Sequence, residues 1–269
     1  MISGVTLRVA GHFGELMQGR IGPDGPVALI TLPCPALFVE ARRAKIADHH
    51  GVLPPARARA MLDHLGLRDP GPFTLTATMP RGGGAGASTA ALVALARLAG
   101  AKQSPPDLAC ACVAVEGASD PLMFPSPERL LWASRRAEVL ESLPPLPAFD
   151  VLGGFFGPNR RTDPKDTNFP DIADLIAPWA AAAEAGDIGA LARLASLSAE
   201  RSLAMRGHLP DPTAALAKQT GALGHVIAHT GSARGLLFAP GTVPPGAPAL
   251  LAGHGFRRII AFRAGGECK

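Results

Sequence analysis

The sequence from Pro80 to Leu98, PRGGGAGASTAALVALARL, joins a loop of glycine and alanine directly to a run of strong helix formers. Leu92, Leu95 and Leu98 recur on one side of that run, as on a helix that faces a core. Ser88 stands where an N-cap hydroxyl is expected. Such a junction leaves backbone N–H groups pointing outward at the positive end of the helix dipole. The stretch therefore predicts an anion-binding loop, and a nucleotide phosphate is the commonest occupant.

Two familiar phosphate-binding motifs do not fit this loop. A Walker A loop ends in Gly-Lys-Ser/Thr, whereas here Ser88 follows Ala87 and the loop contains no lysine. A dinucleotide-binding fingerprint that starts at Gly84 would need glycine five residues later, where the chain has Thr89. The loop therefore belongs to a different phosphate-binding pattern.

The loop resembles the second motif of the GHMP kinases, the superfamily of galactokinase, homoserine kinase, mevalonate kinase and phosphomevalonate kinase. That motif reads Pro, three variable residues and then Gly-x-Gly-x-Ser, which Pro80 and residues 84–88 match. The resemblance implies that the loop binds the phosphates of ATP. The implied ATP-binding residues are Pro80, Gly82, Gly83, Gly84, Ala85, Gly86, Ala87, Ser88 and Thr89.

A second glycine-rich stretch lies near the N-terminus, after an alternating segment, 5–10, that predicts a strand. Its sequence from Gly11 to Gly19, GHFGELMQG, resembles the first GHMP motif in the form GELxQG. That form is typical of the L-threonine kinases of cobalamin biosynthesis, of the propanediol-utilisation type. The resemblance implies that Glu15 and Gln18 lie beside the substrate, while a tight turn with an exposed glutamate is the alternative for Glu15.

Two acidic residues, Glu116 and Asp120, bracket a short turn after a predicted helix, 107–115. In the threonine-kinase group the corresponding stretch reads Val-Glu-x-x-Asp-Ser, and related GHMP kinases place an Asp there beside the acceptor hydroxyl. The resemblance implies Asp120 and Ser88 as catalytic residues, with Asp120 the general base and Ser88 and Glu116 the Mg²⁺ ligands. A helix-terminal cap or a solvated surface charge is the alternative role for either acid.

A third motif lies near the C-terminus, where two short apolar segments within 224–238 flank a polar turn. It resembles the third GHMP motif, whose threonine-kinase form is His-Ser/Thr-Gly-x-x-x-Gly. The residues that match this form are His229, Thr230, Gly231 and Gly235. The resemblance implies that the turn closes on the phosphate and the substrate. The substrate-binding residues implied or guessed here are Thr230, Gly231, Ser232 and, for a substrate carboxylate, Arg234.

Composition favours a globular protein of the cytoplasm. The 269 residues are 47% hydrophobic and 18% charged, enough for one large domain or two small ones. No apolar stretch is long enough to cross a bilayer, and the four cysteines have no paired metal spacing. The net charge of +4 suits an anionic ligand, but without clustered Lys and Arg among aromatics a nucleic acid is not an expected partner.

Residue periodicity predicts alternating strands and helices along the rest of the chain. The predicted strands are 27–30, 36–41, 73–79, 149–156 and 257–262, and the predicted helices are 57–67, 125–143, 172–185, 186–205 and 211–223. Prolines at 144, 145 and 147 predict a domain boundary between residues 146 and 147. The resemblance implies an α+β GHMP kinase fold, with an N-terminal ATP-binding α/β domain (1–146) like domain 2 of ribosomal protein S5. A ferredoxin-like α+β domain (147–269) follows it.

The three motifs, in family order, imply an ATP- and Mg²⁺-dependent kinase that converts L-threonine to O-phospho-L-threonine for cobalamin biosynthesis, as a monomer or homodimer. One departure is Gly83, which stands where threonine kinases of this group often carry a lysine. Arg81 or Lys102 would have to supply the missing cation. Three alternatives are left open: another GHMP kinase such as a homoserine kinase, a catalytically silent nucleotide-binding protein, and a nucleic-acid-binding module. For the silent protein, Gly83→Lys would be the first reversion to try.

Overall fold

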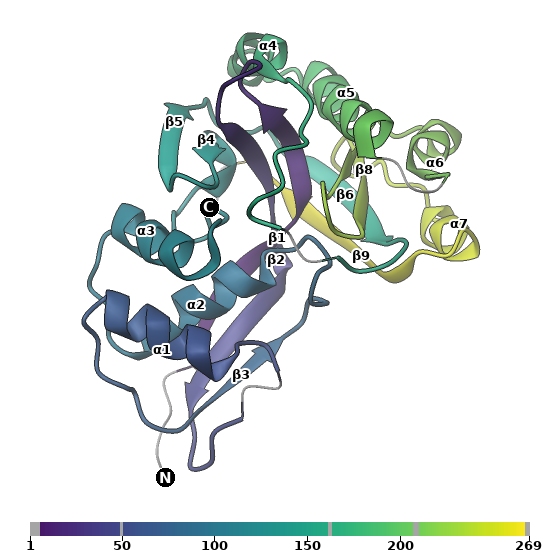
Figure 1. Cartoon of the computed structure of the whole chain (residues 1–269). Helices are drawn as coiled ribbons and strands as arrows, with labels where there is room; N and C mark the ends of the chain where they lie inside the picture. The colour runs from purple at the N-terminus through teal and green to yellow at the C-terminus, as the bar shows by residue number, and fades with distance from the viewer. Residues whose placement is uncertain (1–5, 49–50, 161–162, 207–209, 267–269) are drawn as a thin grey trace.

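The two longest strands of the computed structural model, β1 (Thr6–Arg20) and β2 (Val27–Arg43), form an antiparallel pair inside a nine-stranded sheet (Figure 1). The structure describes residues 6–48, 51–160, 163–206 and 210–266. The other strands are β3 (Phe73–Ala77), β4 (Leu130–Ala133), β5 (Glu138–Ser142), β6 (Phe149–Phe155), β7 (Gly224–Ile227), β8 (Ala233–Phe238) and β9 (Arg257–Ala264). Their order is β5-β4-β2-β1-β7-β8-β6-β9, with β3 paired to another part of β2. The strand pairs are antiparallel, so the expected α+β class is confirmed.

The helices gather in two groups along this sheet. They are α1 (Pro55–His64), α2 (Ala87–Leu98), α3 (Pro105–Glu116), α4 (Ala173–Glu184), α5 (Ile188–Arg206), α6 (Thr213–Thr220) and α7 (Ala247–Gly253). Among the first three, α2 lies against β1 and β2, and α1 and α3 pack on α2, whereas α5, α6 and α7 lie on the side of β6 to β9 (Figure 1). The single β1–β7 pairing, Glu15 with Ile227, joins the N-terminal strands to the C-terminal ones.

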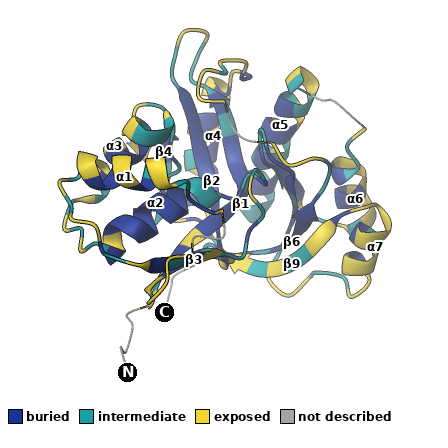
Figure 2. Ribbon diagram, turned by 60° about the horizontal axis from the view of Figure 1, so that its bottom comes forward, coloured by how far each residue is buried: buried dark blue, intermediate teal, exposed yellow. Residues whose placement is uncertain are grey.

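Helix α2 is the central helix of the N-terminal half. Its side chains are almost all buried, and Figure 2 shows it in dark blue with the β1–β2 pair, between more exposed helices. A helix that is apolar all round is stable only inside a core. Small buried residues such as Ala90, Ala91 and Ala94 allow α2 to lie close to β1 and β2. The loop that precedes α2 is thus anchored to the most rigid part of the protein.

The segment 125–143 is not the helix that its periodicity predicted. It forms a 3₁₀ turn (Pro127–Arg129) and then the β4–β5 hairpin. β4 pairs with β2 and buries Trp132 completely, and the Trp132 Nε1–H donates to the Ser119 carbonyl at 2.8 Å. Helix propensity is a weak preference, and here strand pairing and burial of a large aromatic ring outweigh it.

Several other elements differ in extent from the prediction. β1 runs on through the stretch 11–19, which was expected to bend, and accommodates it with bulges. The two predicted strands 27–30 and 36–41 are one strand, β2, and α7 was not predicted. The N-cap of α2 is Gly86, in the left-handed region with φ of 71°, and not Ser88. Val5, at the start of the first predicted strand, lies outside the described residues.

Within the part of the chain that the structure describes, no helix has both the length and the apolar character needed to cross a membrane. Cys34, Cys110 and Cys112 are free thiols, two of them buried. Cys268 lies outside the described residues.

We expect the Trp132→Phe variant to lower the free energy of unfolding by about 2–3 kcal/mol, because the smaller ring leaves a cavity and the Ser119 carbonyl loses its donor. Denaturant unfolding measures this loss. A Trp179→Phe variant makes the same ring change in the buried part of α4 and serves as the control. Equal losses in the two variants would show that the hydrogen bond to Ser119 contributes nothing of its own.

Candidate active site

The loop before α2 has the backbone of an anion nest. Gly82, Gly84 and Gly86 have φ values of 70°, 73° and 71° and alternate with residues outside the left-handed region. Such alternation turns successive N–H groups toward one side of the chain, where they form a concavity for an anion. The first turn of α2 adds N–H groups that have no intrahelical acceptor. The predicted phosphate-binding geometry is therefore present.

The carbonyl groups of the same loop point away from this concavity, because four of them accept hydrogen bonds from other segments. The bonds are Arg160 N–H to Gly82 O (2.9 Å), Ala233 N–H to Gly83 O (2.9 Å), Gly14 N–H to Gly84 O (3.2 Å) and His12 N–H to Ala85 O (3.2 Å). The donors come from β1, from β8 and from the segment after β6. The two other glycine-rich motifs thus hold the loop in place.

Glycine is required where these motifs touch. A Cβ atom on Gly11 would lie 2.5 Å from the Ala85 carbonyl oxygen, and one on Gly231 would lie 2.2 Å from the Gly84 nitrogen. Both distances are shorter than van der Waals contact, so the backbones could not pack this closely with any larger residue. The three glycine-rich motifs therefore pack directly on one another and form one site.

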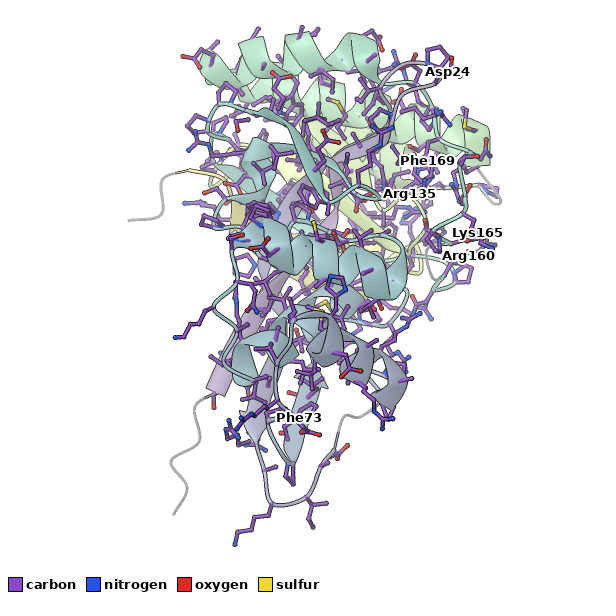
Figure 3. All side chains as sticks on the ribbon, turned by 60° about the vertical axis from the view of Figure 1, so that its left-hand side comes forward. Asp24, Phe73, Arg135, Arg160, Lys165 and Phe169 are labelled. Carbon is purple, nitrogen blue, oxygen red and sulfur yellow. The ribbon has the colours of Figure 1, made fainter. Side chains whose placement is uncertain are left out.

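A cavity of about 260 Å³ lies over the loop and collects most of the predicted residues. Those that line it are Glu15, Gln18, Pro80, Gly82, Gly83, Gly84, Ala85, Gly86, Ala87, Ser88, Glu116, Asp120, Thr230 and Gly231. Thr89 lies just behind the cavity wall, where its hydroxyl accepts the Asp120 N–H at 3.2 Å. Figure 3 draws the side chains of the described residues, with Arg135, Arg160, Lys165 and Phe169 along one edge of the view.

Two of the predicted substrate-binding residues are engaged elsewhere. The Arg234 guanidinium donates to Asp211 at 2.7 Å and to the Gly231 carbonyl at 3.0 Å, and it lines a second, adjoining cavity of about 290 Å³. The Ser232 hydroxyl donates to Asn159 at 2.6 Å. Both side chains brace the turn that carries Thr230 and Gly231, so they shape the first cavity without lining it.

The side-chain oxygens of Ser88 and Glu116 lie next to each other, as two ligands of one metal ion would. The Ser88 hydroxyl donates to Oε1 of Glu116, and the Arg57 guanidinium contacts the same oxygen at 2.5 Å. Burial raises the pKa of Glu116, against the opposing effects of Ser88 and Arg57. A carboxylate and a hydroxyl beside an anion nest are the ligand types that Mg²⁺ takes together with phosphate oxygens. The residues therefore fit the metal that the resemblance implied.

His12 is a site residue for which the sequence reading gave no role. Its side chain is 2% exposed, with Nε2 3.4 Å from Oδ2 of Asp120 and Nδ1 3.5 Å from Oε1 of Glu15. Burial alone lowers the pKa of His12, but the charge and hydrogen bond of Asp120 and the charge of Glu15 outweigh it and raise the pKa to about 9. One ligand atom from each of these three residues lies within 4.8 Å of the others, so the set could also hold a metal ion.

Two buried acceptors on the same side of the cavity have no hydrogen-bond partner among the described residues. They are Oε2 of Glu15 and Oε1 of Gln18. Burial raises the pKa of Glu15 to about 7, against the lowering effect of the His12 charge. Because a buried acceptor without a donor is costly, these oxygens fit a ligand that brings N–H or O–H groups.

Arginines, and not a loop lysine, supply the positive charge at the nest. Arg81 lines the cavity as the sequence suggested, and so do Arg57 and Arg160, which no sequence signal singled out; Lys102 is not among the lining residues. A Cβ atom on Gly83 would lie 2.8 Å from Cγ of Pro80 and 2.9 Å from Cε1 of Phe155. The loop of this protein therefore has no room for the lysine that the sequence resemblance would place at this position.

The segment 163–169, which lies between β6 and α4 in the sequence, closes one side of the cavity. Pro164 lines the cavity, and the Phe169 ring stacks on His229 with 3.8 Å between ring centroids and 7° between planes. The Arg135 guanidinium lies 5.0 Å from the centroid of Phe169 (Figure 3). Burial and the charge of Arg206 lower the pKa of His229 to about 3, so its ring is neutral.

Solved structures of mevalonate kinase, homoserine kinase and mevalonate pyrophosphate decarboxylase share this fold over nearly the whole chain. L. major mevalonate kinase in complex with R-mevalonate is similar with a TM-score of 0.66 and 13% identity over 97% of each chain. A homoserine kinase from Cytophaga hutchinsonii has a TM-score of 0.59 and 19% identity over 96% of this chain and 93% of its own. Mevalonate pyrophosphate decarboxylase from Streptococcus pyogenes has a TM-score of 0.63 and 12% identity over 98% of this chain and 97% of its own.

At these identities the likeness establishes the GHMP kinase fold and leaves the reaction to be argued from the site. No family model matches the chain, and no curated protein matches it in sequence. The fold expected from the three motifs is thus confirmed.

We expect Gly83→Lys to weaken ATP binding and stability, because a Cβ atom at this position would clash with the rigid Pro80 and Phe155 rings. Calorimetric titration with ATP and a thermal melt measure the two effects. Gly246→Lys is the matched control, since a Cβ atom there meets nothing within 4 Å. Tighter ATP binding by Gly83→Lys would show that the loop does accept the cation.

We expect the free energy of unfolding to fall as the pH rises from about 6.5 through about 9. His12 has a folded-state pKa above its ordinary 6.5, so its contribution is complete below that pH and is lost as the pH passes about 9. Glu15, raised from 4.5 to about 7, acts in the same direction.

Denaturant unfolding at a series of pH values tests this dependence. The double variant His12→Asn with Glu15→Gln removes both titrating groups, so its stability should change less over the same range. An identical slope in the wild type and the double variant would contradict the assignment.

Proposed function

We propose that this protein is an ATP-dependent small-molecule kinase that transfers a phosphoryl group to the hydroxyl of an amino acid, with L-threonine as the first candidate. One observation carries the proposal. A single cavity combines an anion nest, a Ser88–Glu116 oxygen pair, the carboxylate of Asp120 and two unpaired acceptors. Phosphoryl transfer needs these parts together, because catalysis rests on positioning and on charge stabilisation.

The nest would hold the phosphates of ATP through the N–H groups of the loop and of the first turn of α2. Arg57, Arg81 and Arg160 supply positive charge around it. Ser88 and Glu116 would hold Mg²⁺, which when bound offsets negative charge on the transferring phosphate. Arg57 contacts the same carboxylate oxygen, so Mg²⁺ bound there would compete with Arg57 for it.

Asp120 would act as the general base for the acceptor hydroxyl. Its Oδ2 faces His12 and the Thr89 hydroxyl, which leaves Oδ1 for the hydroxyl proton. The backbone of Asp120 is fixed by Thr89, and the preceding Ser119 by Trp132 and by a hydrogen bond to the Ser134 carbonyl. A base held in this way can take the proton while the phosphoryl group moves.

The acceptor side favours an amino acid over an uncharged alcohol or an acid without an amine. An α-ammonium group would supply donors to Glu15 and Gln18, whose buried oxygens lack them. Thr230 and the N–H of Gly231 also line the cavity and are the candidate groups for the carboxylate. Arg234 and Ser232 act through this turn.

L-Homoserine is the second candidate acceptor, because it carries the same ammonium and carboxylate with a longer hydroxyl arm. The GELxQG form of the first motif favours threonine, and a homoserine kinase is among the proteins that share the fold. We place the reaction in the cytoplasm and propose a role in cobalamin biosynthesis. We also propose that the boundary between the two domains lies between residues 146 and 147. The free thiols fit a reducing compartment.

We expect ADP release from Mg-ATP in the presence of L-threonine, above the rates with L-serine, L-homoserine and mevalonate. In Asp120→Asn this rate should fall by about 10²- to 10⁴-fold, since the hydroxyl loses its base, while calorimetric ATP binding is retained. Asp63→Asn, at an exposed position of α1, is the control substitution.

Faster turnover of L-homoserine would keep the kinase and replace the acceptor. ATP binding without turnover on any acceptor would refute the kinase and favour a silent nucleotide-binding protein.

A further inference from the structure

His12 is the buried ionisable residue of the cavity that the proposed reaction does not use. We propose that His12 is a positioning residue of the acceptor side, which ties Glu15 to Asp120 so that one carboxylate meets the acceptor hydroxyl and the other its ammonium group. The inference rests on the proposed kinase function and deepens it. The motif pattern gives His12 no role, and the inference is that His12 holds Glu15 and Asp120 in place.

The geometry places His12 between the two acids. Nε2 lies 3.4 Å from Oδ2 of Asp120, while Nδ1 lies 3.5 Å from Oε1 of Glu15 and 3.1 Å from the Gly14 carbonyl oxygen. Among the described residues, both ring nitrogens therefore face acceptor oxygens. Only the doubly protonated imidazolium can donate on both sides. The ring thus bridges the acids as a cation.

The ring cannot turn away from this position. The His12 N–H donates to the Ala85 carbonyl, which fixes the backbone to the phosphate loop. A Cβ atom on Gly86 would lie 2.7 Å from Cδ2 of His12, so the ring packs directly on the start of α2. His12 therefore couples the acceptor side to the loop that holds the phosphates.

The bridge decides which carboxylate oxygens remain available. Oε1 of Glu15 faces the ring, whereas Oε2 is buried without a partner and lies toward the cavity. Asp120 likewise uses Oδ2 for His12 and Thr89. Arg234 adds a further positive charge that acts on Glu15.

Two isosteric variants separate the two halves of the bridge. The amide nitrogen of Gln reaches close to the position of Nε2, and that of Asn reaches only to the position of Nδ1. We expect His12→Asn to lower kcat by about 10- to 100-fold, because Asp120 loses its partner. This loss is smaller than the loss expected when the general base itself is removed. His12→Gln should recover most of kcat but raise the KM for the acceptor.

A double-variant comparison distinguishes positioning from a structural role. If His12 acts through Asp120, then His12→Asn should change kcat by less than about 3-fold in an Asp120→Asn background. Full multiplication of the two effects, or equal losses in His12→Asn and His12→Gln that follow the loss of thermal stability, would overturn the inference. His64→Asn, on the exposed side of α1, is the matched control.

A readout without turnover tests the bridge itself. In the ¹⁵N NMR spectrum of the whole protein, Asp120→Asn should shift mainly the Nε2 signal of His12, and Glu15→Gln mainly the Nδ1 signal. Unshifted ring signals would overturn the inference, as would a change on treatment with a chelator or with Zn²⁺ at equimolar concentration, which would make His12 a metal ligand. Absence of turnover with an intact bridge would instead refute the kinase proposal and leave His12 without a catalytic role.

Discussion

The site depends on one constraint, which is that the carbonyl groups of the loop before α2 are bonded away from the cavity. Gly82 to Ala85 direct these carbonyls to β1, to β8 and to the segment after β6. A peptide group that turns its oxygen backward turns its N–H forward, so the bonds to Gly83, Gly84 and Ala85 favour the anion nest, whereas the Gly83 N–H donates within the loop to the Pro80 carbonyl at 3.1 Å. The close approach they need explains why glycine recurs in all three motifs. The core around α2 then holds the assembly rigid.

Electrostatic balance is the second organising feature of the site. Three acids, Glu15, Glu116 and Asp120, line one cavity, and each of them faces a cationic side chain. Arg57 pairs with Glu116, and His12 lies between the other two. Buried carboxylates are costly unless they are paired, and here the pairing also leaves selected oxygens free for ligands. Arginines from several segments, Arg57, Arg81 and Arg160, supply the positive charge around the loop, which itself contains no lysine.

Much of the fold was predictable from local pattern. The glycine loop, the helix after it and most strands have signals within a few residues, and the three motifs brought their segments to one cavity as expected. The helix predicted over 125–143 was wrong, because pairing with β2 and burial of Trp132 act between distant segments. Ser88 was misplaced as a cap for a similar reason, since its hydroxyl is drawn to Glu116.

The sequence by itself determined the anion-binding loop and the order of the motifs, because these follow from residue type and spacing along the chain. The α+β class was implied by the resemblance of these motifs to the GHMP kinases. Only the tertiary structure decided the partners of the charged side chains. It placed His12 between two acids, engaged Arg234 with Asp211 and excluded a side chain at Gly83. Each of these outcomes depends on distances between segments that lie far apart in the chain, for which the sequence carries no local signal.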